Sequence, residues 1–203
     1  AALKDPSMSA ATAPVKATEK ALASTSISPP ERKERSMELD GITYKTYTHE
    51  KQLDWIVDLM KKDLSEPYSV YTYRYFINNW PDLCWLALSG DKCIGAIVCK
   101  QDDHKGKSIR GYIAMLAVDS EFRGKGIGSE LVKRAVTVMK EHKCEEAVLE
   151  TEITNLGAIR LYTNLGFIKD KHLSKYYMNG GDAWRLKLWL AYDEDPKDKP
   201  WLE

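Results

Sequence analysis

The sequence carries no net charge, because its 30 lysine and arginine residues are balanced by 30 aspartate and glutamate residues. A neutral chain generates no overall field that would draw in nucleic acid or an anionic membrane surface. We therefore expect no direct binding to either. Any anionic ligand must be held by a local group of donors and cations.

Long apolar runs are also missing. No stretch approaches the roughly 18 apolar residues of a membrane span, and the beginning of the chain lacks the apolar core of a secretory signal. These absences favour a cytoplasmic protein. An organellar transit peptide is the minor alternative, since the first residues are rich in Ala, Ser and Thr but include acidic residues such as Asp5 and Glu19.

Cysteine and histidine are scarce, with four of each. The cysteines form no C-x-x-C pair, and His142 and Cys144 have no second pair at the spacing of zinc ligands. The sequence therefore predicts no metal site. It also predicts no covalent cysteine intermediate, because no thiol has a neighbouring group in the sequence that would lower its pKa.

The apolar content is sufficient for one domain. The chain has 203 residues, of which 43% are apolar, enough for a single well-buried core. Residues 1–40 are rich in small and polar side chains and predict a disordered N-terminal extension. Residues 41–191 predict the domain, and residues 192–203 predict a charged C-terminal tail.

Apolar periodicity predicts the elements of the domain. Strands are expected over 42–47, 84–88, 93–99, 112–118, 147–151, 167–177 and 183–190, and helices over 53–64, 70–80, 127–138 and 158–165. The last two strands flank a turn with two glycines and form a hairpin. The fold class is therefore α/β, with a mixed, mostly antiparallel sheet of about seven strands and helices on both faces.

A glycine-rich turn joins the predicted strand 112–118 to the following helix. Three glycines allow the backbone to approach a ligand, and unpaired N–H groups at the helix start attract a pyrophosphate. A Walker A loop is excluded, because Lys125 is followed by Gly126 and not by Ser or Thr. The glycine interval also differs from that of the dinucleotide fingerprint. A ligand-free tight turn is the less favoured alternative.

Two motifs, one in this turn and one further along the chain, carry a family resemblance. Arg123-Gly124-Lys125-Gly126-Ile127-Gly128 matches the R-x-x-G-x-G signature of the GNAT superfamily of acetyltransferases, and residues 155–162 resemble its later N-x-x-A-x-x-L-Y motif. The resemblance implies an acetyl-CoA site. Its cofactor-binding residues would be Leu116, Ala117, Val118, Arg123, Gly124, Lys125, Gly126, Ile127, Gly128, Ser129, Asn155 and Tyr162.

Within the superfamily the chain is most similar to NatC-type N-terminal acetyltransferase catalytic subunits, through blocks such as residues 63–69, 111–118 and 149–152. This likeness implies acetylation of nascent chains that begin with Met and a bulky apolar residue. It also implies a large scaffold subunit, a small Sm-like subunit and association with the ribosome through that complex. The implied substrate-binding residues are Leu64, Glu66, Tyr68, Tyr112, Met115, Tyr176 and Tyr177.

Acetyl transfer to an amine needs a base for the amine and an acid for the departing thiolate. Glu150 and Glu152 lie on one face of their strand near its C-terminal end, and we expect Glu150 to be the base, directly or through water, with Glu152 the alternative. The resemblance assigns the acid to Tyr162. We expect direct attack in a ternary complex. A lysine or small-amine acetyltransferase and a non-catalytic acetyl-CoA-binding module stay open as alternatives.

Overall fold

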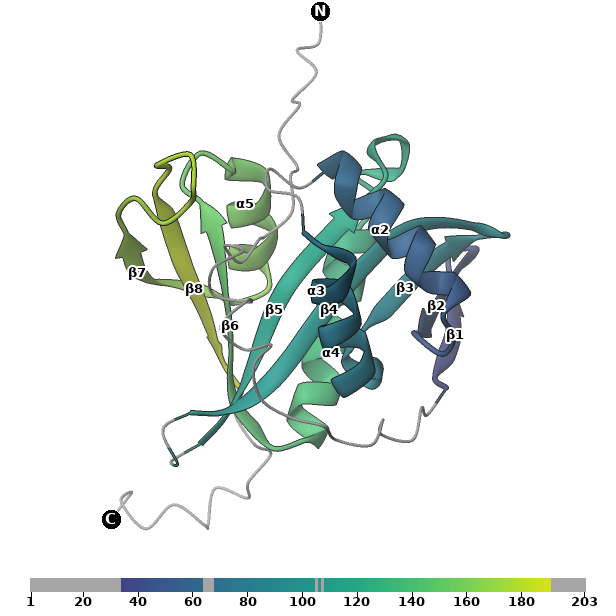
Figure 1. The fold of residues 1–203 in the computed structure, drawn as a ribbon, viewed down its shortest axis with the longest axis horizontal. Helices are drawn as coiled ribbons and strands as arrows, with labels where there is room; N and C mark the ends of the chain where they lie inside the picture. Colours follow the sequence, from purple (N-terminus) through teal and green to yellow (C-terminus); the bar gives the residue numbers. More distant parts are fainter. Residues whose placement is uncertain (1–33, 64–67, 105, 107, 191–203) are drawn as a thin grey trace, which may run out of the picture.

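The computed structural model describes residues 34–63, 68–104, 106 and 108–190. Most of the predicted extension and the whole predicted tail lie outside these residues. Within them the chain forms one mixed sheet with the strand order β1-β2-β3-β4-β5-β6-β8-β7 (Figure 1). The predicted α/β class is confirmed, with eight strands in the described part where about seven were expected.

The first half of the sheet is antiparallel and carries two helices. Its elements are β1 (Ser36–Leu39), β2 (Ile42–Thr46), α2 (Lys51–Asp63), α3 (Val70–Asn79), the 3₁₀ helix η1 (Pro81–Leu83), β3 (Trp85–Ser89), β4 (Lys92–His104) and β5 (Ser108–Val118). Helix α3 begins at an N-cap, where the Ser69 side chain accepts a hydrogen bond from the Thr72 N–H. It ends just before Pro81, which cannot continue a helix.

The second half alternates helices and strands. Its elements are the 3₁₀ helix η2 (Ser120–Phe122), α4 (Ile127–Glu141), β6 (Cys144–Glu152), α5 (Leu156–Asn164), β7 (Ile168–Leu173) and β8 (Ala183–Trp189). Strand β6 runs parallel to β5 after the α4 crossover, and β7 and β8 pair as an antiparallel hairpin. The predicted β-α-β-α unit and terminal hairpin are therefore confirmed. Among the described residues, no helix is long and apolar enough to cross a membrane.

Among the strands of the described residues, β1 is the one that the sequence did not predict, since it falls in the segment assigned to the disordered extension. Its four residues are all exposed, so it has no burial pattern to detect. Backbone pairing with β2 holds it, from Ser36 opposite Lys45 to Leu39 opposite Ile42. The Arg35 N–H also donates to Thr46 Oγ1 at 2.9 Å. The sheet therefore begins at Ser36 and not at residue 41.

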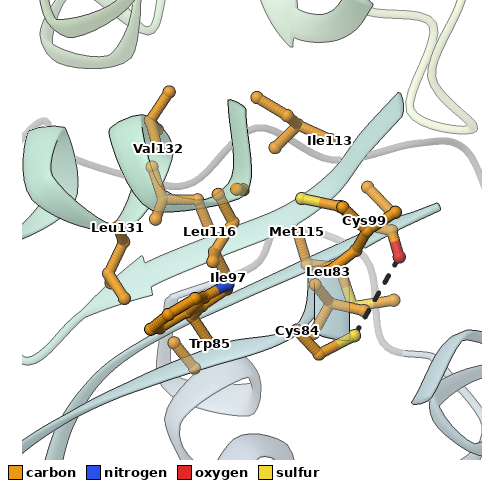
Figure 2. Close-up of a cluster of buried hydrophobic side chains, with 14 of the residues drawn as sticks. Leu83, Cys84, Trp85, Ile97, Cys99, Ile113, Met115, Leu116, Leu131 and Val132 are labelled. Atoms are coloured by element: carbon orange, nitrogen blue, oxygen red, sulfur yellow. Dashed lines mark hydrogen bonds between the residues drawn. The ribbon is translucent and has the colours of Figure 1, made fainter. Parts of the chain in front are cut away.

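The hydrophobic core lies between the sheet and the helices on its two faces. Helices α2 and α3 cover one face and α4 covers the other (Figure 1). Glycines on the strands bring α4 close, because a Cβ on Gly111 would lie 2.4 Å from Met139 Sδ. Figure 2 shows Leu131 and Val132 of α4 with Leu116 of β5 in this core. Cys84 Sγ donates to the Cys99 carbonyl at 3.9 Å in the same cluster.

Strands β5 and β6 separate at their C-terminal ends. They pair only from Ile109 to Tyr112 on β5, although β5 continues to Val118 and β6 to Glu152 (Figure 1). The β5 strand also carries a bulge at Ala114. Val98 pairs with Met115 and Cys99 with Ile113, so Ala114 has no residue opposite it on β4. Bulges and unpaired strand ends are typical of ligand sites, because they leave backbone groups free to bind.

Candidate active site

The glycine-rich turn forms an open cradle at the start of α4. Gly124 and Gly126 have φ angles of 76° and 78°, in the left-handed region that favours glycine. A Cβ added to either would meet no described atom within 4 Å. Gly126 is the N-cap of α4, so the first N–H groups of that helix face this open space. The arrangement suits a phosphate bound by backbone donors, as the sequence predicted.

The two predicted cations of the turn are placed differently. Arg123 is turned back into the protein, where its Nε donates to the Val118 carbonyl at 3.1 Å and its Nη2 pairs with Asp63. Burial raises the pKa of Asp63 more than this pairing lowers it. Lys125 is exposed, with its Nζ 4.8 Å from the centre of the Phe122 ring. Arg123 therefore joins the end of α2 to the cradle, and Lys125 is the cation of the turn that faces solvent.

Helix α5 meets the cradle at Gly128. A Cβ on that glycine would lie 2.9 Å from Leu161 Cδ1 and 3.7 Å from Val118 Cγ2, so the start of α4, the end of β5 and α5 converge there. Asn155 caps α5, with Oδ1 accepting from the Ala158 N–H at 3.0 Å. Its predicted contact with the cofactor stays a prediction.

Tyr162 of α5 is one of several buried side chains in the described part of the chain with an unused donor. None of its surface is exposed, and its hydroxyl has no hydrogen-bond partner among the described residues. Its ring packs edge-on against Phe167 with centroids 5.3 Å apart. Burial, with a smaller contribution from Cys99, raises the pKa of Tyr162 well above its ordinary value. The hydroxyl is therefore protonated at neutral pH and is free to donate to a ligand.

Glu150 of β6 is the centre of a second polar cluster and is only 2% exposed. Its Oε2 accepts from the Tyr112 hydroxyl at 2.7 Å, and its Oε1 accepts from Arg185 Nε at 2.8 Å. Tyr176 is close enough for its pKa to respond to this carboxylate. Burial, followed by the nearby carboxylate, raises the pKa values of Tyr112 and Tyr176. Both tyrosines are thus neutral hydrogen-bond donors at neutral pH.

A cavity of about 290 Å³ opens beside this cluster. It lies where β5, β6 and β8 come together, and Tyr112, Glu150, Tyr176 and Arg185 are part of its wall. Val148 adds an apolar surface, and charged residues at the end of the β4–β5 hairpin complete the lining. A buried carboxylate in the wall of a cavity next to separated strand ends suits proton transfer with a small polar group.

The structure brings together only some of the predicted substrate-binding residues. Tyr112 and Tyr176 line the cavity, and Tyr177 packs edge-on against Tyr176 with ring centroids 5.3 Å apart. Tyr68 is 7% exposed and influences the pKa of Tyr112. Met115 is fully buried in the hydrophobic core and does not line the cavity (Figure 2).

Other predicted residues lie apart from the cavity or outside the described residues. Leu64 and Glu66 fall outside them. Glu152, the alternative base, is half-buried at the strand end, where Thr154 Oγ1 donates to its Oε2 at 3.4 Å. Tyr162 does not line the cavity. Glu150 therefore belongs to the cavity wall, whereas Tyr162 lies outside it on α5, the helix whose Leu161 approaches the cradle at Gly128.

Arg185 is the hydrogen-bond partner of Glu150 that the sequence prediction missed. In the segment Ala183–Trp189, Arg185 and Lys187 alternate with Leu186 and Leu188, which indicates two cations on one face of a strand. The identity of their partners depends on how β8 is aligned with β6. That alignment places Arg185 directly opposite Glu150. The alternation was visible in the sequence, but the pairing was not.

Comparison with known proteins agrees with this geometry. Residues 53–167 match the acetyltransferase (GNAT) family. N-alpha-acetyltransferase 30 of Xenopus laevis is 62% identical over 151 residues, which cover 74% of this chain and 55% of that protein. The protein of the same name from Schizosaccharomyces pombe is 49% identical, and the match covers 73% of this chain and 98% of that one. A chain in the crystal structure of the NatC complex bound to Gag peptide and CoA is 46% identical, with a TM-score of 0.72, and 74% of this chain and 99% of that chain are covered.

The chain therefore belongs to the GNAT family of acetyltransferases, in agreement with its cradle, its separated strands and its family match. The resemblance found in the sequence is confirmed at this level. Within the family, the relatives described above are named N-alpha-acetyltransferase 30, and the structural neighbour is a NatC complex. The chain spans about half the length of the Xenopus laevis relative, with 55% of that protein covered.

Proposed function

We propose that this chain is an N-terminal acetyltransferase that transfers an acetyl group from acetyl-CoA to the α-amine of polypeptides beginning with Met and a bulky apolar residue. The observation that carries the proposal is the buried Glu150 carboxylate in the wall of a cavity, held beside separated strand ends in a chain 62% identical to an N-alpha-acetyltransferase 30. A NatC-type complex with a scaffold subunit and an Sm-like subunit, acting at the ribosome in the cytoplasm, is part of the same proposal.

The residues present fit acetyl-CoA. The open cradle at Gly124 and Gly126 offers backbone N–H groups to a pyrophosphate, and Lys125 adds a cation there. The Tyr162 hydroxyl is buried and has no partner among the described residues, so it can donate to the sulfur end of the cofactor. Acetyl-CoA, when bound, supplies an acetyl group activated as a thioester.

The proton transfers fall to two side chains of this protein. Glu150 accepts the proton of the substrate amine, directly or through a water. An α-amine has a pKa of about 7.7 to 8.0, so only modest assistance is needed. Tyr162 donates its hydroxyl proton to the departing thiolate.

The attack is direct, in a ternary complex of protein, peptide and acetyl-CoA. Burial raises the pKa of Cys84 to about 12 and of Cys93 and Cys144 to about 11, and it raises that of Cys99 well above its ordinary value. All four thiols are therefore protonated at neutral pH, which argues against a cysteine nucleophile.

Peptide selectivity and the site of acetylation test the proposal together. We expect Met-Leu, Met-Ile and Met-Phe peptides to react about ten- to a hundred-fold better than Met-Asp or Met-Lys peptides, since burying a Leu-sized side chain gains about 1.5 to 3 kcal/mol and burying an unpaired charge is costly. The resemblance assigns the apolar walls of the peptide site to Leu64 and Tyr68, and the hydrogen bonds to the peptide to Glu66 and the hydroxyls of Tyr176 and Tyr177.

The assay uses peptides with free or blocked N-termini, acetyl-CoA and mass spectrometry to locate the acetyl group. The full chain is tested alone and after co-expression with NatC-type scaffold and Sm-like subunits. Acetylation of Met-Leu on the α-amine alone supports the proposal. Acetylation of lysine side chains in blocked peptides would indicate a lysine acetyltransferase, and acetyl-CoA binding without any transfer would indicate a binding module.

A further inference from the structure

Arg185 lies opposite the Glu150 carboxylate by virtue of strand register. Strand β8 pairs with β6 so that Arg185 faces Glu150 across the ladder, and the Arg185 Nε donates to Glu150 Oε1 at 2.8 Å. The Arg185 side chain is 32% exposed, whereas that of Glu150 is 2% exposed. The guanidinium therefore reaches from the cavity wall to a carboxylate that water barely touches.

The buried Glu150 carboxylate depends on its cationic partner, because removing one member of a buried ion pair leaves the other uncompensated. The pKa of Arg185 reflects the same pairing, because burial acts to lower it but Glu150, together with the two tyrosines, raises it overall. Among the described residues, Arg185 is the cation in contact with Glu150.

The donors around Glu150 leave room for a substrate. A carboxylate has about four lone-pair positions. Arg185 occupies one on Oε1 and Tyr112 occupies one on Oε2. About two positions are left for an amine or a water. Because the guanidinium holds Oε1, the carboxylate cannot rotate without breaking this bond, and the open positions keep a constant direction.

We propose that Arg185 is a positioning residue for acetyl transfer, which holds Glu150 as an oriented anion while Tyr112 and Tyr176 complete the cluster. The proposal rests on the proposed function, because it assigns to Arg185 the support of the base. A purely structural salt bridge between β6 and β8 is the alternative.

The same sheet face offers a matched control. Lys187 lies two residues along β8, and its Nζ is 3.1 Å from Oε2 of Glu146, another buried carboxylate of β6. Lys187 is not part of the cavity wall. Arg185→Ala and Lys187→Ala thus each remove a cation from a buried β6 glutamate, one beside the cavity and one away from it, although Glu146 keeps Arg110 as a second partner.

The experiment measures turnover, acetyl-CoA affinity and thermal unfolding of the full chain, in the assembled form that proves active. Arg185→Ala should lower kcat for a Met-Leu peptide by about ten- to a hundred-fold, a part of what a general base contributes. Acetyl-CoA affinity in a calorimetric titration should not change. Lys187→Ala should keep kcat within about two-fold of the parent, although both variants lose stability.

Chemical rescue separates positioning from structure. Millimolar methylguanidinium should restore part of the kcat of Arg185→Ala, because the side chain it replaces is reachable from the cavity, and methylammonium should restore less. Arg185→Lys, which keeps the charge and suits the case in which the alanine variant does not fold, should fall between the parent and Arg185→Ala.

These measurements decide between a positioning role for Arg185 and a purely structural salt bridge. Unchanged kcat in folded Arg185→Ala or Arg185→Lys, or equal losses of kcat in Arg185→Ala and Lys187→Ala without rescue, would overturn the positioning role while leaving the acetyltransferase proposal intact. If the parent transferred no acetyl group to any N-terminus, the proposed function itself would fall, and this inference with it.

Discussion

At the scale of single residues, two buried side chains differ in whether their polar atoms have hydrogen-bond partners. Glu150 accepts hydrogen bonds from Tyr112 and Arg185, whereas the hydroxyl of Tyr162 has no partner among the described residues. A buried polar group without a partner costs about 1 to 3 kcal/mol. The protein tolerates this cost on α5, the helix that meets the cradle at Gly128, which is consistent with a hydroxyl available to a ligand.

Tyr162→Phe separates stability from activity. We expect the free energy of unfolding to stay the same or to rise by up to about 1 kcal/mol, because no hydrogen bond within the described residues is lost and an unpaired polar atom is removed. Turnover should fall by about 10²- to 10⁴-fold if the hydroxyl is the acid. Denaturant unfolding and initial rates provide the two measurements.

Tyr47→Phe is the matched control for this substitution. Tyr47 is 1% exposed, but its hydroxyl donates to Glu50 at 3.4 Å. The Tyr47→Phe variant should therefore have a slightly lower free energy of unfolding than the parent and the same turnover. Normal turnover in Tyr162→Phe would remove the acid role.

At the scale of elements, the turn between β5 and α4 combines backbone conformation with a helix start. Left-handed φ angles at Gly124 and Gly126 allow the chain to turn from the end of β5 into α4. The first N–H groups of α4 then face open space. The tie between Arg123 and Asp63 anchors this turn to the end of α2, immediately before residues 64–67. The cradle is therefore made mostly of backbone, with Lys125 as its solvent-facing cation.

Gly126→Ala tests the cradle, and Gly90→Ala is its control. Both glycines have positive φ and open space where a Cβ would stand, but Gly90 lies in the β3–β4 turn. Each substitution should cost about 1 to 2 kcal/mol of stability through the left-handed backbone. In a calorimetric titration Gly126→Ala alone should bind acetyl-CoA more weakly, by about ten-fold or more, since a methyl group blocks the approach of phosphate to the backbone. Equal affinities in the two variants would contradict the cradle assignment.

At the scale of the whole molecule, the buried thiols link stability to pH. Burial raises the pKa of Cys84 to about 12 and the pKa values of Cys93 and Cys144 to about 11, from the ordinary value of 9.0. The folded protein keeps these protons at pH values where the unfolded chain has released them. Their contribution to stability is therefore complete below pH 9 and is lost as the pH rises from 9 towards 12.

Unfolding by urea under reducing conditions at several pH values checks this link. We expect the free energy of unfolding to fall steadily above about pH 9, since each unit of pKa difference corresponds to about 1.4 kcal/mol. Cys84→Ala should start from a lower stability, because a core atom is lost, but its decline with pH should be shallower. A stability that stayed level between pH 9 and pH 11 would show that these thiols do not titrate differently in the two states.

The sequence by itself determined the local features of this protein. The order of strands and helices follows from apolar periodicity, and the cradle follows from three glycines and two cations between a strand and a helix. Glu150 was predicted from its place on one face of a strand near the C-terminal end, and Tyr162 from the family resemblance of residues 155–162. Such signals are local, since a few neighbouring residues are enough to set a turn, a cap or the face of a strand.

The tertiary structure alone decided how distant residues meet. Strand register placed Arg185 against Glu150, and the turning of Arg123 towards Asp63 left Lys125 as the exposed cation of the cradle. Strand β1 is held by backbone hydrogen bonds, which leave no side-chain pattern. Register, ion pairing and the separation of β5 from β6 depend on contacts between residues far apart in the chain. The physical reason is that strand pairing depends on interactions across the whole sheet. A short stretch of sequence therefore does not determine it.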